Sequence, residues 1–460
     1  MGEEVVKRNR ITEGNIFGQL LLFFFPILFG TFFQQLYNTA DAMVVGRFVG
    51  KQALAAVGGT TSTLINLLVG FFVGLSSGAT VVISQFYGAR KADKVHWAVH
   101  TSIAFSILGG IVLMTVGQTA CHWALVTMKT PEDVLPHALI YLRIYFLGMI
   151  ANLLYNMGAG ILRAVGDSKR PLYFLVASCL INIVVDVVLV AVLKLGVAGA
   201  AIATVSSQVF SAVLVVTALM RTDDMYRLVW KKVRIDTIML RRIVRIGVPA
   251  GMQSVMYNIS NIIIQAGVNT LGTDNVTAWA TYGKVDGLFW MMTNALGIAV
   301  TTFVGQNYGA GRMDRVRKGA GACVIIGTTL TALVGGLLYF YGHVLIELFT
   351  SDVGVQKICM QLIHFMVPTF ITYIGIEILS GTLRGVADTW TPLMITCVGI
   401  CVLRVMWITF VLPHFHTILG AAVCYPISWS LTTVAFVIYY YFFSTLRRWN
   451  GTALFRRTGR

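Results

Sequence analysis

The chain of 460 residues is 57% hydrophobic and only 12% charged, whereas soluble domains carry about 25% charged residues. This composition excludes an ordinary soluble protein and indicates a membrane protein. The formal net charge of +16 could suggest nucleic-acid binding, but the positions of the basic residues, given below, favour an orientation signal, and we expect no nucleic acid as a partner.

Twelve apolar segments follow one another along the chain, most of them reaching the roughly 20 residues that cross a bilayer as a helix. The alternating pattern of membrane β-strands is absent. We therefore predict an all-α polytopic membrane protein with transmembrane helices at residues 16–45, 54–82, 95–116, 134–160, 171–193, 197–219, 238–266, 276–303, 319–341, 358–381, 392–412 and 418–444.

The basic residues are distributed unevenly between the two sides of this layout. With the N-terminus in the cytosol, most of the 35 Lys and Arg residues lie on the cytosolic side, which is the positive-inside pattern. The exceptions are Arg47, Lys51, Lys129, Lys194 and Lys357 on the opposite side, and Arg143, Lys284 and Arg404 within spans. We expect a multi-pass protein of the cell's inner (plasma) membrane with both termini cytosolic.

The two halves of the chain resemble each other at a shift of 221 residues. "SQFYGARKADKV" (84–95) matches "GQNYGAGRMDRV" (305–316), and "LRAVGDSKRPL" (162–172) matches "LRGVADTWTPL" (383–393). Such a repeat predicts two pseudo-symmetric six-helix lobes. Because six is an even number, both lobes have the same orientation, and repeats of this kind are typical of transporters that bind substrate between two halves. The predicted parts are a lobe at 1–220, a basic cytosolic linker at 221–237 and a lobe with a basic tail at 238–460.

Two local patterns predict packing. The linker has Trp230 and Val233 among basic residues, which favours an amphipathic helix at the lipid headgroups. In "GFFVGLSSG", Gly70, Gly74 and Gly78 are four residues apart, as in helices that contact a neighbour closely.

No pattern of catalysis is present. The chain lacks the GxxxxGK[ST] loop of ATP-driven pumps, and the neighbouring Asp223 and Asp224 lie in the basic linker without a second acidic pair. His343 and Glu347 are one turn apart near the outer surface, which is weak support for a metal or catalytic site. We expect a protein that is not an enzyme and has no cofactor.

Charged side chains within the spans are the candidate functional residues, because a charge at bilayer depth is costly. The acids are Asp41, Asp186, Asp286 and Glu377. Asn182 and Asp186 are four residues apart and therefore share a helix face. Thr204, on the next predicted helix, lies at a similar depth. Carboxylate, amide and hydroxyl oxygens are ligands for a small hard cation, and the same group could hold a proton.

Alternatives without ion binding exist for each acid. Asp186 could bond a neighbouring polar group, Arg404 could neutralise Glu377, and Lys284 could pair locally with Asp286. The repeat favours a functional role in the first half: at a shift of 221 residues Asp186 corresponds to Trp407, and at the neighbouring shift of 220 Asp41 corresponds to Asn261. A purely architectural role would be expected in both halves.

Taken together, the doubled motifs and "QQLYNTADAMVVGR" resemble the multidrug and toxic compound extrusion (MATE) family over nearly the whole chain. The resemblance implies a twelve-helix antiporter that expels amphipathic, often cationic compounds in exchange for H⁺ or Na⁺. It also implies a coupling site for H⁺ or Na⁺ at Asp41, Asn182, Asp186 and Thr204, and a helix bend at Pro26. Secondary candidates are Gln34, Tyr37, Tyr257, Asn261, Glu377 and Arg404. Other branches of the family have acids in both the seventh and tenth helices. This chain departs from them, because its seventh predicted helix has Tyr257 and Asn261 and no acid, and Glu377 is the only acid of the tenth.

The expected mechanism combines these sites. Cation or proton binding neutralises Asp41 and Asp186 and favours another packing of the first helix, and a substrate cavity changes shape as a result. Residues proposed to line that cavity are Phe289, Trp290, Met291 and Met292. The alternatives are a lipid-linked oligosaccharide or lipid flippase of related architecture, and a membrane enzyme or receptor. We expect a monomer.

Overall fold

The structure is a computed structural model that describes residues 10–444 and Leu446. Every regular element within that part of the chain is helical. Ten of the helical segments are long and apolar enough to cross a membrane, and a bent pair forms an eleventh. A twelfth helix, α10 (Thr237–Asn269), is 33 residues long but less apolar, because it has three Arg residues near its start and several Asn and Gln residues further on. The prediction of an all-α membrane protein is confirmed, and each of the twelve predicted spans is helical. Both termini, including the predicted basic tail, lie outside the described residues.

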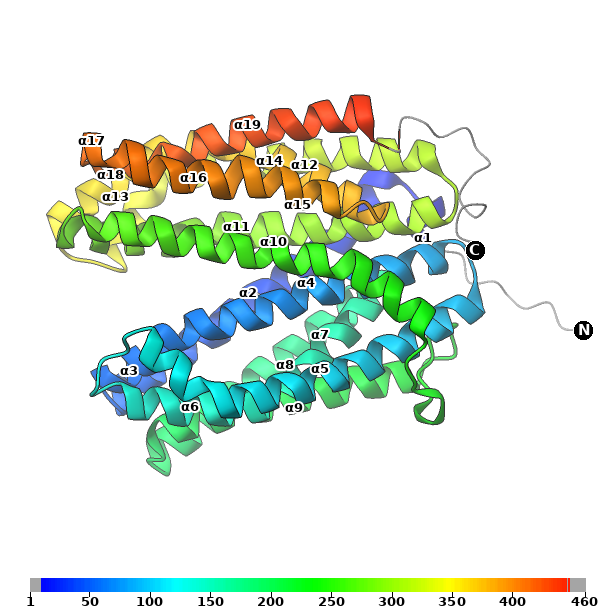
Figure 1. Cartoon of the computed structure of the whole chain (residues 1–460), viewed down its shortest axis with the longest axis horizontal. Coiled ribbons are helices and arrows are strands. Elements are labelled where there is room, and N and C mark those ends of the chain that lie inside the picture. Colours follow the sequence, from blue (N-terminus) through cyan, green and yellow to red (C-terminus); the bar gives the residue numbers. More distant parts are fainter. Residues whose placement is uncertain (1–9, 445, 447–460) are drawn as a thin grey trace, which may run out of the picture. The chain divides into compact units, whose positions relative to one another are not determined.

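The first half begins with the short α1 (Arg10–Glu13). Its membrane segments are α2 (Ile16–Phe48), α3 (Lys51–Gly58) with α4 (Thr60–Gly88), α5 (Ala92–Thr127), the bent pair α6 (Leu135–Leu147) and α7 (Met149–Ala164), α8 (Lys169–Asp186) with the π-helix η1 (Val187–Val192), and α9 (Gly196–Met220). Helices α5 to α9 pack on one another, as seen in Figure 1.

The second half repeats this order after the 3-10 turn η2 (Trp230–Lys232). It contains α10, α11 (Thr273–Gly309), α12 (Met313–Glu347), α13 (Val353–Met366) with η3 (Val367–Phe370) and α14 (Ile371–Gly385), and then two interrupted spans. The first of these consists of α15 (Trp390–Thr396), η4 (Cys397–Val402), α16 (Leu403–Met406), η5 (Trp407–Val411) and α17 (Leu412–Phe415); the last consists of α18 (Ile418–Ala422), α19 (Cys424–Ile438) and η6 (Tyr439–Phe443).

The chain forms two compact units whose boundaries fall inside helices. Among the described residues, one unit comprises 25–251 and the other comprises 10–24 together with 252–444. Helices α2 and α10 each pass from one unit to the other, and each has a proline within two residues of the crossing, Pro26 and Pro249. The contacts thus group residues 10–24 with the second half of the chain, and the linker with the first.

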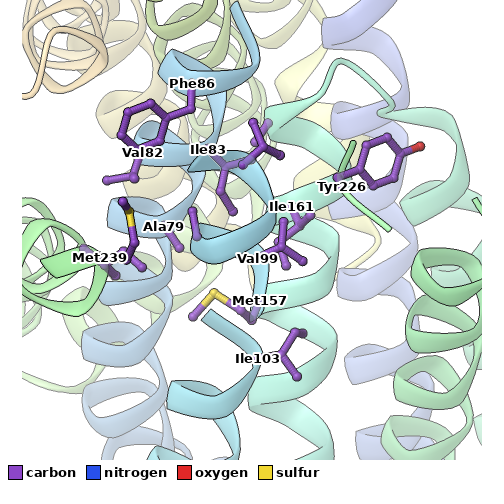
Figure 2. Packing of buried hydrophobic residues seen from close by; sticks show 14 of the residues in the cluster. Ala79, Val82, Ile83, Phe86, Val99, Ile103, Met157, Ile161, Tyr226 and Met239 are labelled. Carbon is purple, nitrogen blue, oxygen red and sulfur yellow. The ribbon is translucent and has the colours of Figure 1, made fainter. Parts of the chain in front are cut away.

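The hydrophobic core of the 25–251 unit shows why the start of α10 belongs to it. Figure 2 shows side chains of α4, α5 and α7 packed together, with Tyr226 of the linker and Met239 of α10 against them. Ile243, one turn beyond Met239, is also fully buried in this cluster. The apolar side chains that precede the predicted seventh span therefore complete the core of the first half.

Glycines bring α4 and α10 into backbone contact. A Cβ atom on Gly74 would overlap Gly251, and one on Gly78 would overlap the backbone of Ile243 and Gly247. The predicted close helix contact is confirmed for these two residues. The partner helix contributes its own pair of small residues four apart, Gly247 and Gly251, which is the pattern that allows helix backbones to approach in a membrane.

We expect Gly78→Ala to destabilise the protein by about 1–3 kcal/mol, because the added methyl group has only α10 backbone to displace. The matched control is Gly336→Ala in α12, where a Cβ atom meets nothing within 4 Å. There the same substitution should be neutral or stabilising by up to about 1 kcal/mol, since Ala favours a helix over Gly. Thermal unfolding in detergent measures both; equal midpoints for the two variants would contradict the contact.

The predicted amphipathic helix of the linker is wrong. The linker contains only the 3-10 turn at Trp230 and otherwise lies along α5. The backbone N–H of Val229 donates to His100 Nε2 (3.0 Å), the N–H of Asp236 donates to Thr101 Oγ1 (3.1 Å), and the Arg234 guanidinium lies 4.3 Å from the Trp97 ring centroid. Side chains of α5 thus satisfy linker N–H groups that an α-helix would have used internally.

Candidate functional site

Three helices of the 25–251 unit place the predicted cation ligands. Asp41 lies on α2, Asn182 and Asp186 on α8, and Thr204 on α9, which packs against α8. All four are buried, and the last three are 1–2% exposed. Asp186 is the last residue of α8 before the helix continues as η1, whose wider turn is the kind of irregularity that often marks functional sites.

Most polar atoms of this group make no hydrogen bond within the described part of the chain. Asp41 Oδ1, both polar atoms of Asn182, both carboxylate oxygens of Asp186 and Thr204 Oγ1 are buried without a hydrogen bond. Neither acid forms an ion pair with any residue between 10 and 444. The alternative in which Asp186 bonds a neighbouring polar group therefore finds no such neighbour.

Asp186 acts electrostatically on Asp41, so the two carboxylates repel each other when both are ionised. Burying two like charges without a counter-ion is costly. A bound proton or metal cation removes that cost, and oxygen ligands of this type suit a hard ion. The chemistry of this group therefore suits the binding of a cation or a proton.

One residue near this group was missed by the sequence analysis. Tyr141 of α6 is buried and interacts electrostatically with Asp41 and Tyr37. Its ring stacks on Tyr145, one turn later, with centroids 6.1 Å apart. Two tyrosines four residues apart on an apolar helix were the available signal. Of the secondary candidates on α2, Tyr37 is half-buried and Gln34 is exposed.

In the other unit, Glu377 of α14 has a partner different from the one considered above. Arg384 Nη2 lies 3.3 Å from Glu377 Oε1, and the Tyr373 hydroxyl donates to Glu377 Oε2 at 3.3 Å. The idea that Arg404 neutralises Glu377 is wrong, because Arg384 lies two turns further along the same helix and satisfies the acid there. Tyr257 is half-buried and interacts electrostatically with Glu377 and Arg404, while Asn261 is exposed.

Lys284 and Asp286 do not pair with each other. The Trp290 indole N–H donates to Asp286 Oδ2 at 2.6 Å, and Lys284 Nζ lies 5.1 Å from the centroid of the Phe349 ring. The local pair was the wrong alternative: the side chains two residues apart on a helix point in different directions.

The four residues proposed to line a substrate cavity differ in burial. Phe289 is fully buried and stacks on Phe370 with ring centroids 4.1 Å apart, and Met292 is also buried. Their burial favours helix packing over contact with a ligand. Trp290 and Met291 are half-buried and stay candidates.

The sequence pattern of the MatE family matches residues 26–188 and again 249–409. The chain belongs to the MatE family. The two matches, one in each half, agree with the internal repeat. This MatE protein is a multi-pass membrane protein by its helices and its family.

The MatE protein is similar to curated proteins and solved structures over nearly its whole length. It is 29% identical to "Probable multidrug resistance protein YoeA" of Bacillus subtilis, with 96% of each chain covered. It is 27% identical to "Probable multidrug resistance protein YpnP" of the same organism, covering 87% of this chain and 89% of that one. A solved structure described as the outward-facing conformation of a multidrug resistance MATE family transporter superposes with a TM-score of 0.88 at 20% identity, covering 95% of this chain and 98% of that one.

Proposed function

We propose that this MatE protein is a secondary active exporter of amphipathic, often cationic compounds, driven by inward movement of H⁺ or Na⁺. The observation that carries the proposal is the buried group of Asp41, Asn182, Asp186 and Thr204, which has several oxygen atoms without partners and no basic residue to neutralise it. The names of its relatives in Bacillus subtilis support drugs as cargo. We place the protein in the plasma (inner) membrane as a monomer with cytosolic termini, without a cofactor or catalytic activity.

Coupling follows from the charge of this group. When Asp41 and Asp186 are both ionised, their repulsion favours uptake of a proton or Na⁺ from the outside. When one ion is bound, the net charge of the two acids falls from −2 to −1 and their mutual repulsion is removed, so the site tolerates a drier environment. The ion therefore stabilises a different arrangement of the surrounding helices from the one that the empty site prefers, as alternating access requires.

Helix α2 connects that change to the rest of the molecule. It carries Asp41 and contains Pro26 in its interior, where one intrahelical hydrogen bond is missing. Pro26 also lies next to the crossing between the two compact units after Phe24. A bend at Pro26 would thus alter the path of the helix between the crossing and the cation site. We propose that this bend changes the shape of the substrate cavity.

The flippase alternative has weaker support. An anionic pyrophosphate cargo would require several basic side chains inside the protein. Of the three basic residues within predicted spans, Arg143 and Lys284 are exposed and only Arg404 is buried. One guanidinium is too few for that cargo.

The test is transport of a fluorescent lipophilic cation by the purified protein in liposomes, with pH and Na⁺ gradients imposed separately. We expect export that depends on one or both gradients and stops when the gradient is dissipated. Export that is independent of both gradients would contradict ion coupling. Chemical conversion of the compound without movement across the membrane would establish an enzyme instead.

A further inference from the structure

A buried arginine in the second half has no acidic partner. Arg404 of α16 is 2% exposed. Its Nε donates to Ser428 Oγ at 3.0 Å, and its Nη2 is buried without any hydrogen bond. No carboxylate lies within ion-pair distance of it in the described residues. A guanidinium stays charged in proteins, so this positive charge is buried without compensation by an acid.

The aromatic side chains around Arg404 compensate only in part. The guanidinium carbon lies 4.0 Å from the centroid of the Tyr425 ring and 5.8 Å from that of Trp429. Such cation–π contacts stabilise the buried positive charge. The free-energy cost of removing an ion from water is larger than the stabilisation that these contacts give. We therefore expect a negatively charged group beside Arg404.

The buried acids of this unit do not pair with Arg404. Glu377 is bound by Arg384 and Tyr373. Asp286 accepts from Trp290 through Oδ2, while its Oδ1 has no hydrogen bond and lies beyond ion-pair distance of Arg404. A second donor beside Arg404 is also without a partner: the indole Nε1 of Trp429 is buried and makes no hydrogen bond, and its residue is 1% exposed. The Arg404 guanidinium and the Trp429 indole thus provide two hydrogen-bond donors without partners in one aromatic cluster, and an anion could accept from both.

The first half of the chain has a group of opposite charge at the corresponding helix, which supports an anion beside Arg404. The eleventh predicted helix is the repeat counterpart of the fifth, where the unpartnered atoms include two carboxylate oxygens of Asp186. At the shift of 221 residues, Asn182 corresponds to Leu403, the neighbour of Arg404. The same helix of the repeat therefore carries a buried acid in one half and a buried base in the other.

We propose that Arg404 and Trp429 form an anion-binding site in the second half of the chain, which accepts a carboxylate. The unpaired guanidinium N–H groups and the indole N–H donate to its oxygens, while Ser428 fixes the orientation of the guanidinium through Nε. The carboxylate belongs either to a transported amphiphile or to a free small anion. Binding to the purified chain is independent of transport, so this proposal and the export function can fail separately.

The first experiment follows the thermal unfolding midpoint of the full-length protein in detergent as benzoate or chloride is added, with neutral benzamide as the shape-matched control. A ligand that binds only the folded state raises the midpoint in a concentration-dependent way. We expect benzoate, and not benzamide, to raise it. A response to chloride equal to that of benzoate would contradict recognition of a carboxylate. No response of the parent to either anion would overturn the proposal.

Variants locate the response. We expect Arg404→Gln to weaken benzoate binding by at least about ten-fold, as for loss of a charged hydrogen bond, while Arg143→Gln, an exposed arginine of a predicted span in the other half, binds like the parent. Trp429→Phe keeps the ring and loses only the N–H, and should weaken binding about five-fold. If Arg404→Gln does not fold, Trp429→Phe decides the question. If Arg404→Gln folds and binds benzoate like the parent, the proposed site is wrong. If it does not fold, parent-like binding by Trp429→Phe has the same meaning.

The source of the carboxylate is distinguished in liposomes. Export of a fluorescent compound with a free carboxylate is compared with export of its methyl ester, in the parent and in Arg404→Gln. If the carboxylate belongs to cargo, we expect selective loss of the acid's export in the variant. If benzoate binds but both compounds are exported equally by the variant, the site serves a free anion.

Discussion

Replacement of Asp186 by Asn is expected to abolish gradient-driven export while the protein remains folded. Asn is close to Asp in size and cannot take up a proton or hold a formal charge. One unit charge near a bound cation contributes about 4 kcal/mol at an effective dielectric constant of ~20, which corresponds to a loss of cation affinity of nearly three orders of magnitude. Asp41→Asn should have the same effect, since both acids serve one ion. Export in liposomes under a pH or Na⁺ gradient measures the loss.

The first control for this experiment is the thermal unfolding midpoint of each variant, which shows whether the protein is still folded. Both acids are buried without an ion pair, and Asp41 Oδ1 and both carboxylate oxygens of Asp186 make no hydrogen bond. Removing one charge therefore relieves repulsion, and we expect an unfolding midpoint equal to or above that of the parent. A matched substitution is Asp167→Asn, whose side chain is 24% exposed and pairs with Arg170 at 3.0 Å; it should transport normally. Parent-like export by Asp186→Asn would remove α8 from the coupling mechanism.

A clear loss of stability is expected from Glu377→Gln. Glu377 and Arg384 are about one-fifth exposed, at 19% and 21%, with 3.3 Å between the charged atoms. Breaking a buried pair leaves an uncompensated charge and costs about 3–5 kcal/mol, and the partial exposure here reduces this to about 2 kcal/mol. Gly297 leaves little space around the carboxylate, since a Cβ atom there would overlap Glu377. Thermal or denaturant unfolding in detergent measures the loss.

Two further variants separate stability from transport. Glu377→Leu combined with Arg384→Leu removes both charges and should recover most of the lost stability. For Glu377→Gln we expect only a partial decrease in export, measured below its unfolding temperature. Complete loss of export in a folded Glu377→Gln protein, with Asp41 and Asp186 intact, would move the coupling site to the second half.

Much of the fold was predictable because the bilayer imposes a simple pattern. Apolar segments of membrane length located all twelve helices, and the repeat predicted two similar halves, which the two MatE matches support. The spacing of Asn182 and Asp186 predicted that they share a helix face, and both are buried. These features depend on residues close in sequence or on hydropathy alone.

The features that were not predicted depend on tertiary packing. The linker was expected to be a helix because its apolar residues suggested a lipid surface; instead His100 and Thr101 of α5 bind its backbone. The partner of Glu377 was sought on the next helix, although Arg384, seven residues away, is two turns along the same face. That spacing was available in the sequence and would have identified the pair.

The two places where the chain passes between its compact units are helical, after Phe24 in α2 and after Gly251 in α10. A flexible loop would absorb a local rearrangement, whereas a helix transmits it as a rotation or tilt along its axis. Asp41 lies fifteen residues beyond Pro26, about 22 Å along α2 at the α-helical rise. Asp41 and the crossing thus lie on one helix with Pro26 between them. If Asp41 binds the coupling ion as proposed, the effect of binding reaches the other unit along α2 and not through a loop.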